Sequence, residues 1–485
     1  MSNFNPLSWL IVATTFAIAQ SVGAVGLPDV PNAHTGKQLG ATTTLTDALM
    51  NGKYDLWFRL RYEDVSDDIP AASALAGTDN AELLSLRTVL GYSTARFHGF
   101  YGRLELEANT RIGSDKALNV DDDLTFPPGP GGSRVAEGYS LIPDNEFEEI
   151  NEAYIGWRNP SSGCTNTPGG CNGNTTVKLG RQTVIYDNHR WVGNIVWRQN
   201  HQSYDAFRID NTSIKDLSIS YTYLDQVNRT FGDDSVFDTW KMDNSHLINV
   251  SYKFPFGKLT GYGYLLDFDD NPKTPFPEGV GAVGTPGIAN FDSDTWGLRF
   301  VGKHKVSETF TLLSELEWAT QEPGNDAGPT LSDNNYYNIE VGGAFKVAGK
   351  PVVVKLGHEV LEGNGVNAVQ TPLATVHAFN GWADKFVGAP GGTATPAGGL
   401  EDTSLTVVVK GLIGPSKLVF QYHDYKSDQT VGGVSDYGSE WGVLFAKPVS
   451  KRWLGLVKYT NFEDGGDGFS FDSEKFWLIA QYRIK

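Results

Sequence analysis

The sequence predicts an all-β protein: a transmembrane antiparallel β-barrel of about 18 strands, with short periplasmic turns and long extracellular loops. Three observations lead to this prediction. Alternating apolar and polar residues recur in short runs from Lys53 onward, short and long connections between the runs alternate, and charged residues fall on the face opposite the apolar ones. A secreted β-sandwich would not require such regular connections, so the barrel is favoured.

The first run shows the alternation clearly. In YDLWFRLRYE, Leu56, Phe58, Leu60 and Tyr62 share one face of a strand, while Trp57, Arg59, Arg61 and Glu63 share the other. The predicted strands are 54–63, 83–92, 102–109, 149–157, 176–180, 203–209, 217–224, 246–254, 259–268, 295–303, 310–319, 335–347, 351–360, 404–412, 417–425, 440–448, 453–462 and 475–484.

The connections between these strands are of two kinds. PFGK, SET, AGK, GPSK and SKR are tight, whereas residues 113–145, 271–290 and 363–399 are long. Counted along the chain, the two kinds alternate, as in barrels with short turns at one end and long loops at the other. One connection departs from this alternation: the long segment around Cys164 and Cys171 lies on the short-turn side.

The N-terminus predicts export. The apolar run WLIVATTFAIA (9–19) precedes the small residues SVGA, so residues 1–24 are expected to be a signal peptide, although no Lys or Arg precedes the run. The alternative is a buried helix of a cytosolic protein. Residues 25–52 would form a periplasmic N-terminal segment and residues 53–485 the barrel. No later apolar run approaches the ~20 residues that a membrane-spanning helix needs.

Composition excludes some partners. The net charge of −18, with acidic loops such as Asp121–Asp123, argues against nucleic acid. Acidic external loops suit divalent bridges to anionic lipid, so outer-membrane lipid and lipopolysaccharide are the expected partners, besides small polar or polyanionic solutes. Cys164 and Cys171 are expected to form a local disulfide, because no further Cys or His nearby suggests a metal site. No cofactor is expected.

Strand alternation also sorts residues toward the lumen. The predicted pore-lining residues are Arg59, Arg61, Arg87, Arg103, Glu105, Arg299, Lys303, Lys355 and Lys410. They could line a permeation path that favours anions. Alternatively, they could form Arg–Glu pairs that knit the wall together.

The segment from Gly180 to Ile209 is unusual for a connecting loop, because it is rich in Arg, Asn, Gln and Trp, which suit contact with polar or sugar-like solutes. A second such segment covers residues 370–386. Either could fold inward as a constriction or pack as structural loops. The predicted rim or constriction residues are Arg181, Arg190, Trp191, Trp197, Arg198, Asn200, Asn380 and Trp382.

The segment LGRQTVIYDNHRWVGNIVWRQNHQSYDAFRI, together with LSLRTVLGY, VNRTFGDDS and TPLATVHAFNGWADKF, resembles the alginate-export family of outer-membrane proteins. The resemblance covers about Tyr54 to Lys485. It implies an 18-stranded barrel and diffusion of solute through a charged lumen. The mixed charges expected here depart from the strongly basic lumen that an anionic polysaccharide requires.

The sequence therefore predicts a passive channel of the bacterial outer membrane for polar solutes, anionic ones among them, such as carbohydrates or organic acids. The alternative is a structural or adhesive barrel with a plugged lumen. Catalysis is not expected: the chain has no HExxH, GxSxG or phosphate-binding loop motif. A barrel lipase would need a Ser–His pair on the lipid face, and His358 is the one histidine predicted to face outward from a strand.

Overall fold

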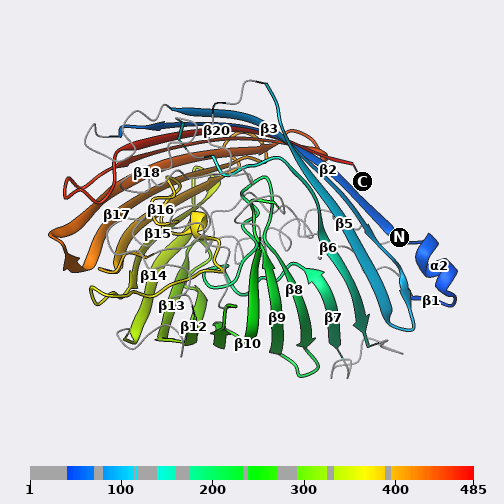
Figure 1. Ribbon diagram of the computed structural model, residues 1–485. Helices are drawn as coiled ribbons and strands as arrows, with labels where there is room; N and C mark the ends of the chain where they lie inside the picture. Colours follow the sequence, from blue (N-terminus) through cyan, green and yellow to red (C-terminus); the bar gives the residue numbers. More distant parts are fainter. Residues whose placement is uncertain are drawn as a thin grey trace.

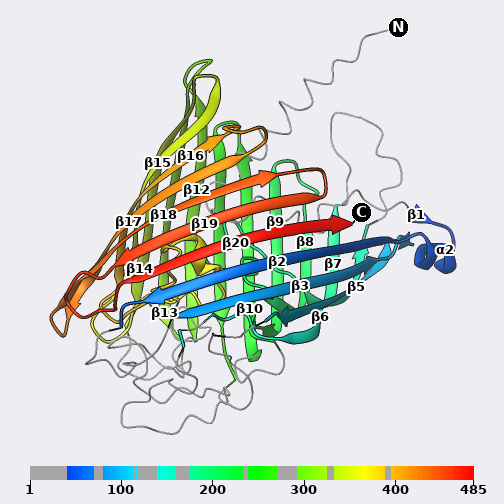
Figure 2. The ribbon, with the colours of Figure 1, turned by 90° about the horizontal axis from the view of Figure 1, so that it is seen from above.

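The computed structural model describes residues 41–69, 80–113, 116, 139–140, 142–159, 174–232, 239–269, 292–324, 332–387 and 395–484. These residues form one closed β-barrel with a short helix at one end (Figures 1 and 2). Among the described residues, no helix is both long and apolar enough to span a bilayer.

The sheet has 20 strands, of which β1 (Ala41–Thr42) and β4 (Arg96–Phe97) have two residues each, so 18 strands form the wall. The wall strands are β2 (Lys53–Asp67), β3 (Ala81–Ser93), β5 (Phe100–Arg111), β6 (Phe147–Arg158), β7 (Thr175–Gln182), β8 (Ser203–Asn211), β9 (Leu217–Asn228), β10 (Thr239–Phe254), β11 (Gly257–Leu266), β12 (Ser293–Lys305), β13 (Thr311–Pro323), β14 (Asn334–Val347), β15 (Lys350–Leu361), β16 (Leu400–Lys410), β17 (Lys417–Val431), β18 (Val434–Pro448), β19 (Trp453–Glu463) and β20 (Ser473–Ile484).

Each wall strand pairs antiparallel with the next one along the chain, and the barrel closes where β2 meets β20. This seam runs from the pair Leu56–Ile484 to the pair Asp67–Ser473. Closure removes the unpaired edges that an open sheet would expose. The predicted fold class and strand number are confirmed.

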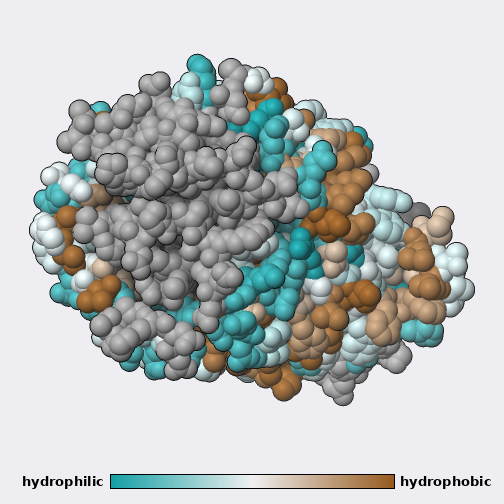
Figure 3. Space-filling model, in the orientation of Figure 1, coloured by the Kyte–Doolittle hydropathy of each residue, from teal (hydrophilic) through white to brown (hydrophobic). Residues whose placement is uncertain are grey.

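The two faces of the wall differ in chemistry. On β5, Leu104 and Leu106 are 45% and 43% exposed, whereas Glu105 between them is 5% exposed. Outward apolar residues recur around the barrel, and Figure 3 shows brown hydrophobic patches between teal ones on the side that carries the N-terminal helix. Such an apolar outer face is what contact with lipid tails requires.

The described part of the N-terminal segment, residues 41–52, is folded against the barrel. The helix α2 (Leu45–Met50) begins at Thr44, whose hydroxyl accepts a hydrogen bond from the backbone N–H of Asp47 at 3.0 Å. β1 pairs in parallel with β4 in the short connection between β3 and β5. The predicted 25–52 segment therefore contacts the short-turn end of the barrel through its described residues, 41–52.

The prediction for one connection is wrong. Residues 426–439 were expected to form a long connection, but β17 and β18 continue through them as a hairpin to a turn at Gly432 and Gly433. These glycines have φ angles of 63° and 89°, the left-handed conformation that a tight hairpin turn requires. The strict alternation of short and long connections therefore fails here.

The predicted signal peptide, the cysteine pair and the acidic segment Asp121–Asp123 lie outside the described residues. They remain predictions.

Candidate functional site

The connection between β7 and β8, residues 183–202, folds into the barrel; we call it the first inner loop. Arg59 of β2 donates a hydrogen bond to its Val196 carbonyl at 3.1 Å. At the other end of the loop, the Asn188 amide donates to Glu315 Oε1 of β13 at 3.1 Å. Because β2 and β13 lie on nearly opposite sides of the ring, the loop crosses the lumen.

Three predicted pore-lining arginines fasten this loop. Arg59 and Arg87 each donate to the Arg198 carbonyl at 3.1 Å. Arg61 donates to the Trp197 carbonyl at 2.6 Å and pairs with Glu63 at 2.6 Å. All three side chains are fully buried, so they face inward as predicted but do not border open water. Direct contact between them and a solute remains a prediction.

The other predicted pore-lining residues fall into two groups. Arg103 pairs with Glu105 and Glu152, Arg299 pairs with Glu315 at 2.8 Å, and Lys355 pairs with Glu340. Lys303 and Lys410 are half-buried near the short turns. The buried pairs correspond to the wall-knitting alternative.

The connection between β15 and β16 also folds inward. Its described residues are 362–387 and 395–399; we call residues 362–387, which include the short helix η3 (Val376–Ala378), the second inner loop. It joins the first inner loop through backbone hydrogen bonds: Gly193 N–H donates to the Leu373 carbonyl at 2.8 Å, and Thr375 N–H donates to the His189 carbonyl at 3.0 Å. The two loops form one layer inside the barrel.

Arg190 ties both loops to the wall. Its guanidinium pairs with Glu359 of β15 at 2.7 Å and donates to Thr371 at 3.1 Å and Asn380 at 3.3 Å. Asn380 in turn donates to Glu359 at 2.6 Å. The predicted rim residue Arg190 is thus a buried bridge at the junction of the two loops.

Lys458 of β19 occupies the other junction. Its ammonium lies 3.9 Å from the ring centroid of Trp197, 4.0 Å from that of Trp382 and 4.9 Å from that of Trp477. It also lies 2.6 Å from His377 Nε2. Because Trp197 and Trp382 come from different inner loops, this cation holds both loops against β19.

His377 is held as a neutral ring between opposite charges. Its Nδ1 lies 2.6 Å from Asp384, and its Nε2 faces Lys458. An N–H at Nδ1 and a lone pair at Nε2 satisfy both neighbours. Burial lowers the pKa of His377 from 6.5 to about 3; Asp384 opposes this shift, while Lys458 and Arg198 add to it.

Acid should therefore loosen the second inner loop. A released His377 takes up a proton below about pH 6.5, whereas the docked ring stays neutral down to about pH 3, so docking is fully stable above pH 6.5 and weakens as the pH falls. The protection of residues 370–386 against hydrogen exchange, after correction for the slower intrinsic exchange in acid, should be lower at about pH 4.5 than at about pH 7. His377→Gln should flatten this difference, and an unchanged pH dependence in that variant would contradict the assignment.

The remaining predicted rim residues fall into two groups, those inside the barrel and Arg181 on its wall. Trp191 donates to Glu317 at 2.9 Å, Arg198 pairs with Asp384 at 2.8 Å, and Asn200 donates to Glu149 at 2.6 Å, all within the barrel. Arg181 is an exception: it belongs to β7, on the same face as the exposed Leu179, and pairs with its strand neighbour Asp205 at 2.8 Å. Its placement on the rim loop is therefore wrong, because β7 extends beyond the predicted strand.

The backbone of the inner loops is strained. Asp187, His189 and Ile195 of the first loop and Asp384 of the second have φ angles between 48° and 69°. For Ile195 the branched side chain makes this conformation costly, by ~1–3 kcal/mol. Hydrogen bonds such as Ile195 N–H to Thr375 Oγ1 at 3.1 Å hold it in place. Strain of this kind is concentrated at functional sites in proteins.

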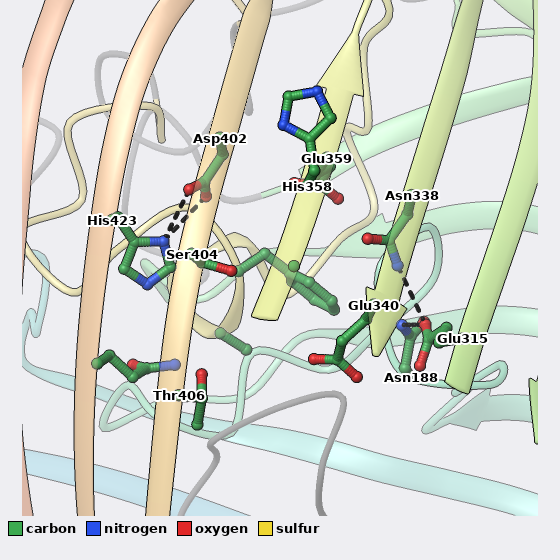
Figure 4. Close-up of a pocket in the computed structure, with 14 residues that line it drawn as sticks. Asn188, Glu315, Asn338, Glu340, His358, Glu359, Asp402, Ser404, Thr406 and His423 are labelled. Atoms are coloured by element: carbon green, nitrogen blue, oxygen red, sulfur yellow. Dashed lines mark hydrogen bonds and ion pairs between the residues drawn. The ribbon is translucent and has the colours of Figure 1, made fainter. Parts of the chain in front are cut away.

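A cavity remains between these loops and the wall formed by β13 to β17. It contains about 570 Å³ of empty space, part of it continuous with solvent. Figure 4 shows Glu340 from β14 and Ser404 and Thr406 from β16 pointing into this space, near Asp402 and His423. Glu340 falls within a predicted strand, 335–347, whereas Asp402 does not, because the predicted strand began at residue 404.

Glu105, Glu107 and His201 have ligand atoms within 4.8 Å of one another and could in principle hold a metal ion. Arg87 already pairs with Glu107, and Arg103 with Glu105. These cations neutralise the carboxylates, so the group is better suited to an ion-pair network than to a metal.

More than one histidine lies on strand faces that point outward. His358 bonds to Thr403 at 3.0 Å on the outer face, but His246 also faces outward, where Tyr221 contacts it at 2.9 Å. The expectation that His358 would stand alone is therefore wrong.

No protein-family model matches the chain, and no curated protein matches it. Solved structures do. OccK9 (OpdG) of Pseudomonas aeruginosa has a TM-score of 0.64 at 10% identity, over 90% of this chain and 99% of that one. OccAB4 of Acinetobacter baumannii has a TM-score of 0.62 at 12% identity, over 89% and 98%.

A third similar structure is Pseudomonas aeruginosa OpdK with vanillate, with a TM-score of 0.63 at 11% identity, over 90% of this chain and 99% of that one. OpdK is also described as an outer membrane protein. At these identities the likeness concerns the fold. The chain is a closed, porin-like β-barrel.

Proposed function

We propose that this protein is a channel of the bacterial outer membrane through which polar solutes diffuse passively. The observation that carries the proposal is the layer of two inner loops, which crosses an 18-stranded barrel and leaves a cavity of polar side chains beside it. An 18-stranded barrel is wider than its own wall side chains can fill. A polar constriction in such a lumen selects solutes by shape and hydrogen bonding.

The similar structures support this proposal, since OpdK is an outer membrane protein solved with vanillate, a small solute. Membership of the alginate-export family rests on the sequence resemblance alone. The buried arginines disfavour passage of a long polyanion, because Arg59, Arg61 and Arg87 are occupied by loop carbonyls. We therefore propose small solutes. Lipid and lipopolysaccharide at the outer face, and an export signal at residues 1–24, belong to the same proposal.

One observation favours a second candidate, a structural barrel with a plugged lumen. The inner loops are extensively buried, and Arg190, Asn200 and Gln199 are between 0% and 1% exposed. Such a barrel would anchor loops at the surface without passing solutes.

Single-channel recording separates these candidates. We expect the refolded protein in planar bilayers to give discrete conductance steps, small for an 18-stranded barrel because the inner loops occupy the lumen. The reversal potential in a salt gradient would then give the ion preference. Bilayers that contain folded protein but show no steps would support the plugged barrel instead.

A further inference from the structure

The cavity beside the inner loops presents acceptors and uncharged donors to its interior. Its lining includes the carboxylates of Glu315, Glu340, Glu359 and Asp402, but no lysine or arginine among the described residues. An anion in this space would meet carboxylate oxygens first. The cavity therefore disfavours the anionic solutes that the sequence suggested.

Buried cations outside the cavity lining nevertheless neutralise three of these carboxylates. Arg299 pairs with Glu315 at 2.8 Å, Lys355 pairs with Glu340, and Arg190 pairs with Glu359 at 2.7 Å. None of these cations lines the cavity. Three of the four carboxylates therefore have a cation partner, and the fourth, Asp402, bonds to His423, so the space has little need of a cationic solute for charge balance. Its oxygens remain good acceptors for hydroxyl groups.

His423 provides an independent sign that a ligand binds here. It is 4% exposed and its Nδ1 lies 3.0 Å from both oxygens of Asp402, yet its buried Nε2 has no hydrogen-bond partner among the described residues. A buried, unpaired polar atom is destabilising. With Nδ1–H donating to Asp402, Nε2 is an acceptor that a solute hydroxyl can fill.

Other polar groups of the same wall are also available. Ser404, Thr406 and Gln421 line the cavity and form no side-chain hydrogen bond with another described residue. Hydroxyl and amide groups can donate and accept, which matches the two roles of each sugar hydroxyl. Phe379 of the second inner loop adds an aromatic ring to the lining.

We propose that this cavity binds a small neutral polyhydroxylated solute, a sugar or polyol, on its way through the barrel. The proposal rests on the proposed channel function and names its substrate class. Carboxylates, amides and an imidazole accept and donate the hydroxyl hydrogen bonds, while the buried cations behind the carboxylates keep the space close to neutral.

Current block by solutes in planar bilayers tests the proposal with the full-length protein. Glucose should block the open channel more strongly than glucuronate or glucosamine. His423→Ala and Gln421→Ala should weaken glucose block by about tenfold, as expected for one or two lost hydrogen bonds. Gln481→Ala is the matched control: it lies on the inner face of β20, outside the cavity, and should leave block unchanged.

The other outcomes overturn distinct claims. Stronger block by glucuronate would show an anion site, and stronger block by glucosamine a cation site; both would refute the neutral-solute proposal while the channel stands. Glucose block that is as strong in His423→Ala and Gln421→Ala as in Gln481→Ala would refute the role of this cavity. Folded protein without conductance in any variant would overturn the channel function itself, and the cavity proposal with it.

Discussion

Replacing Lys458 with Met should release the inner loops from the wall. The substitution removes the cation between Trp197 and Trp382 and leaves His377 Nε2 buried without a donor, at a cost of about 1–3 kcal/mol. A change of this size raises the population of undocked loops roughly tenfold or more. Single-channel records should show frequent openings to a larger conductance.

Two comparisons make this result specific. Lys303→Met, which removes an inner-face lysine that forms no side-chain hydrogen bond or ion pair with either inner loop among the described residues, should leave the records unchanged. His377→Phe combined with Lys458→Met should add little to Lys458→Met alone, because the same contact is lost in both. Additive effects would show that Lys458 does not act through His377.

Shortening the first inner loop should have an even larger effect. Replacement of residues 188–200 by a short Gly–Ser linker removes the layer that crosses the lumen, so conductance should rise several-fold. It also frees Arg59, Arg61 and Arg87 from the carbonyls that occupy them. Arg61 and Arg87 stay paired with Glu63 and Glu107, whereas the guanidinium of Arg59, which has no ion pair among the described residues, becomes a lumenal cation that attracts anions.

The reversal potential in a salt gradient measures this preference. In the shortened background, changing Arg59 to Gln should make the channel less selective for anions while the conductance stays high. An equal shift of the reversal potential on changing Arg59 to Gln in the intact protein would contradict the assignment of Arg59 to fastening the loop.

The barrel could be predicted because its pattern is local. Alternation within each run sets which residues face lipid, and all 18 predicted strands occur. Errors arose where local signals were weak. The hairpin around Gly432 is flanked by Ser, Asp and Thr, which resemble a loop, and the strand carrying Arg181 continues two residues past Gly180.

The inner loops could not be predicted in the same way. The composition of Gly180–Ile209 marked it as unusual, but its position depends on contacts between distant parts of the chain, such as Arg59 with Val196 and Arg190 with Glu359. Whether an inward arginine meets water or a loop carbonyl is decided by those contacts. His423 and Gln421 lie two residues apart in a predicted strand, so the alternation places them on the same face. No sequence signal, however, linked His423 to Asp402.

The first inner loop also contacts both strands of the closing seam. Arg61 of β2 donates to the Trp197 carbonyl, and the Trp197 indole packs against Trp477 of β20 at 5.6 Å between ring centroids. The first and last wall strands are therefore joined twice, once by their own ladder and once through this loop. Because such distant segments must meet last during folding, seam closure and loop insertion are expected to be one coupled step of assembly. The loop thereby acts as an internal brace against lateral opening of the finished barrel.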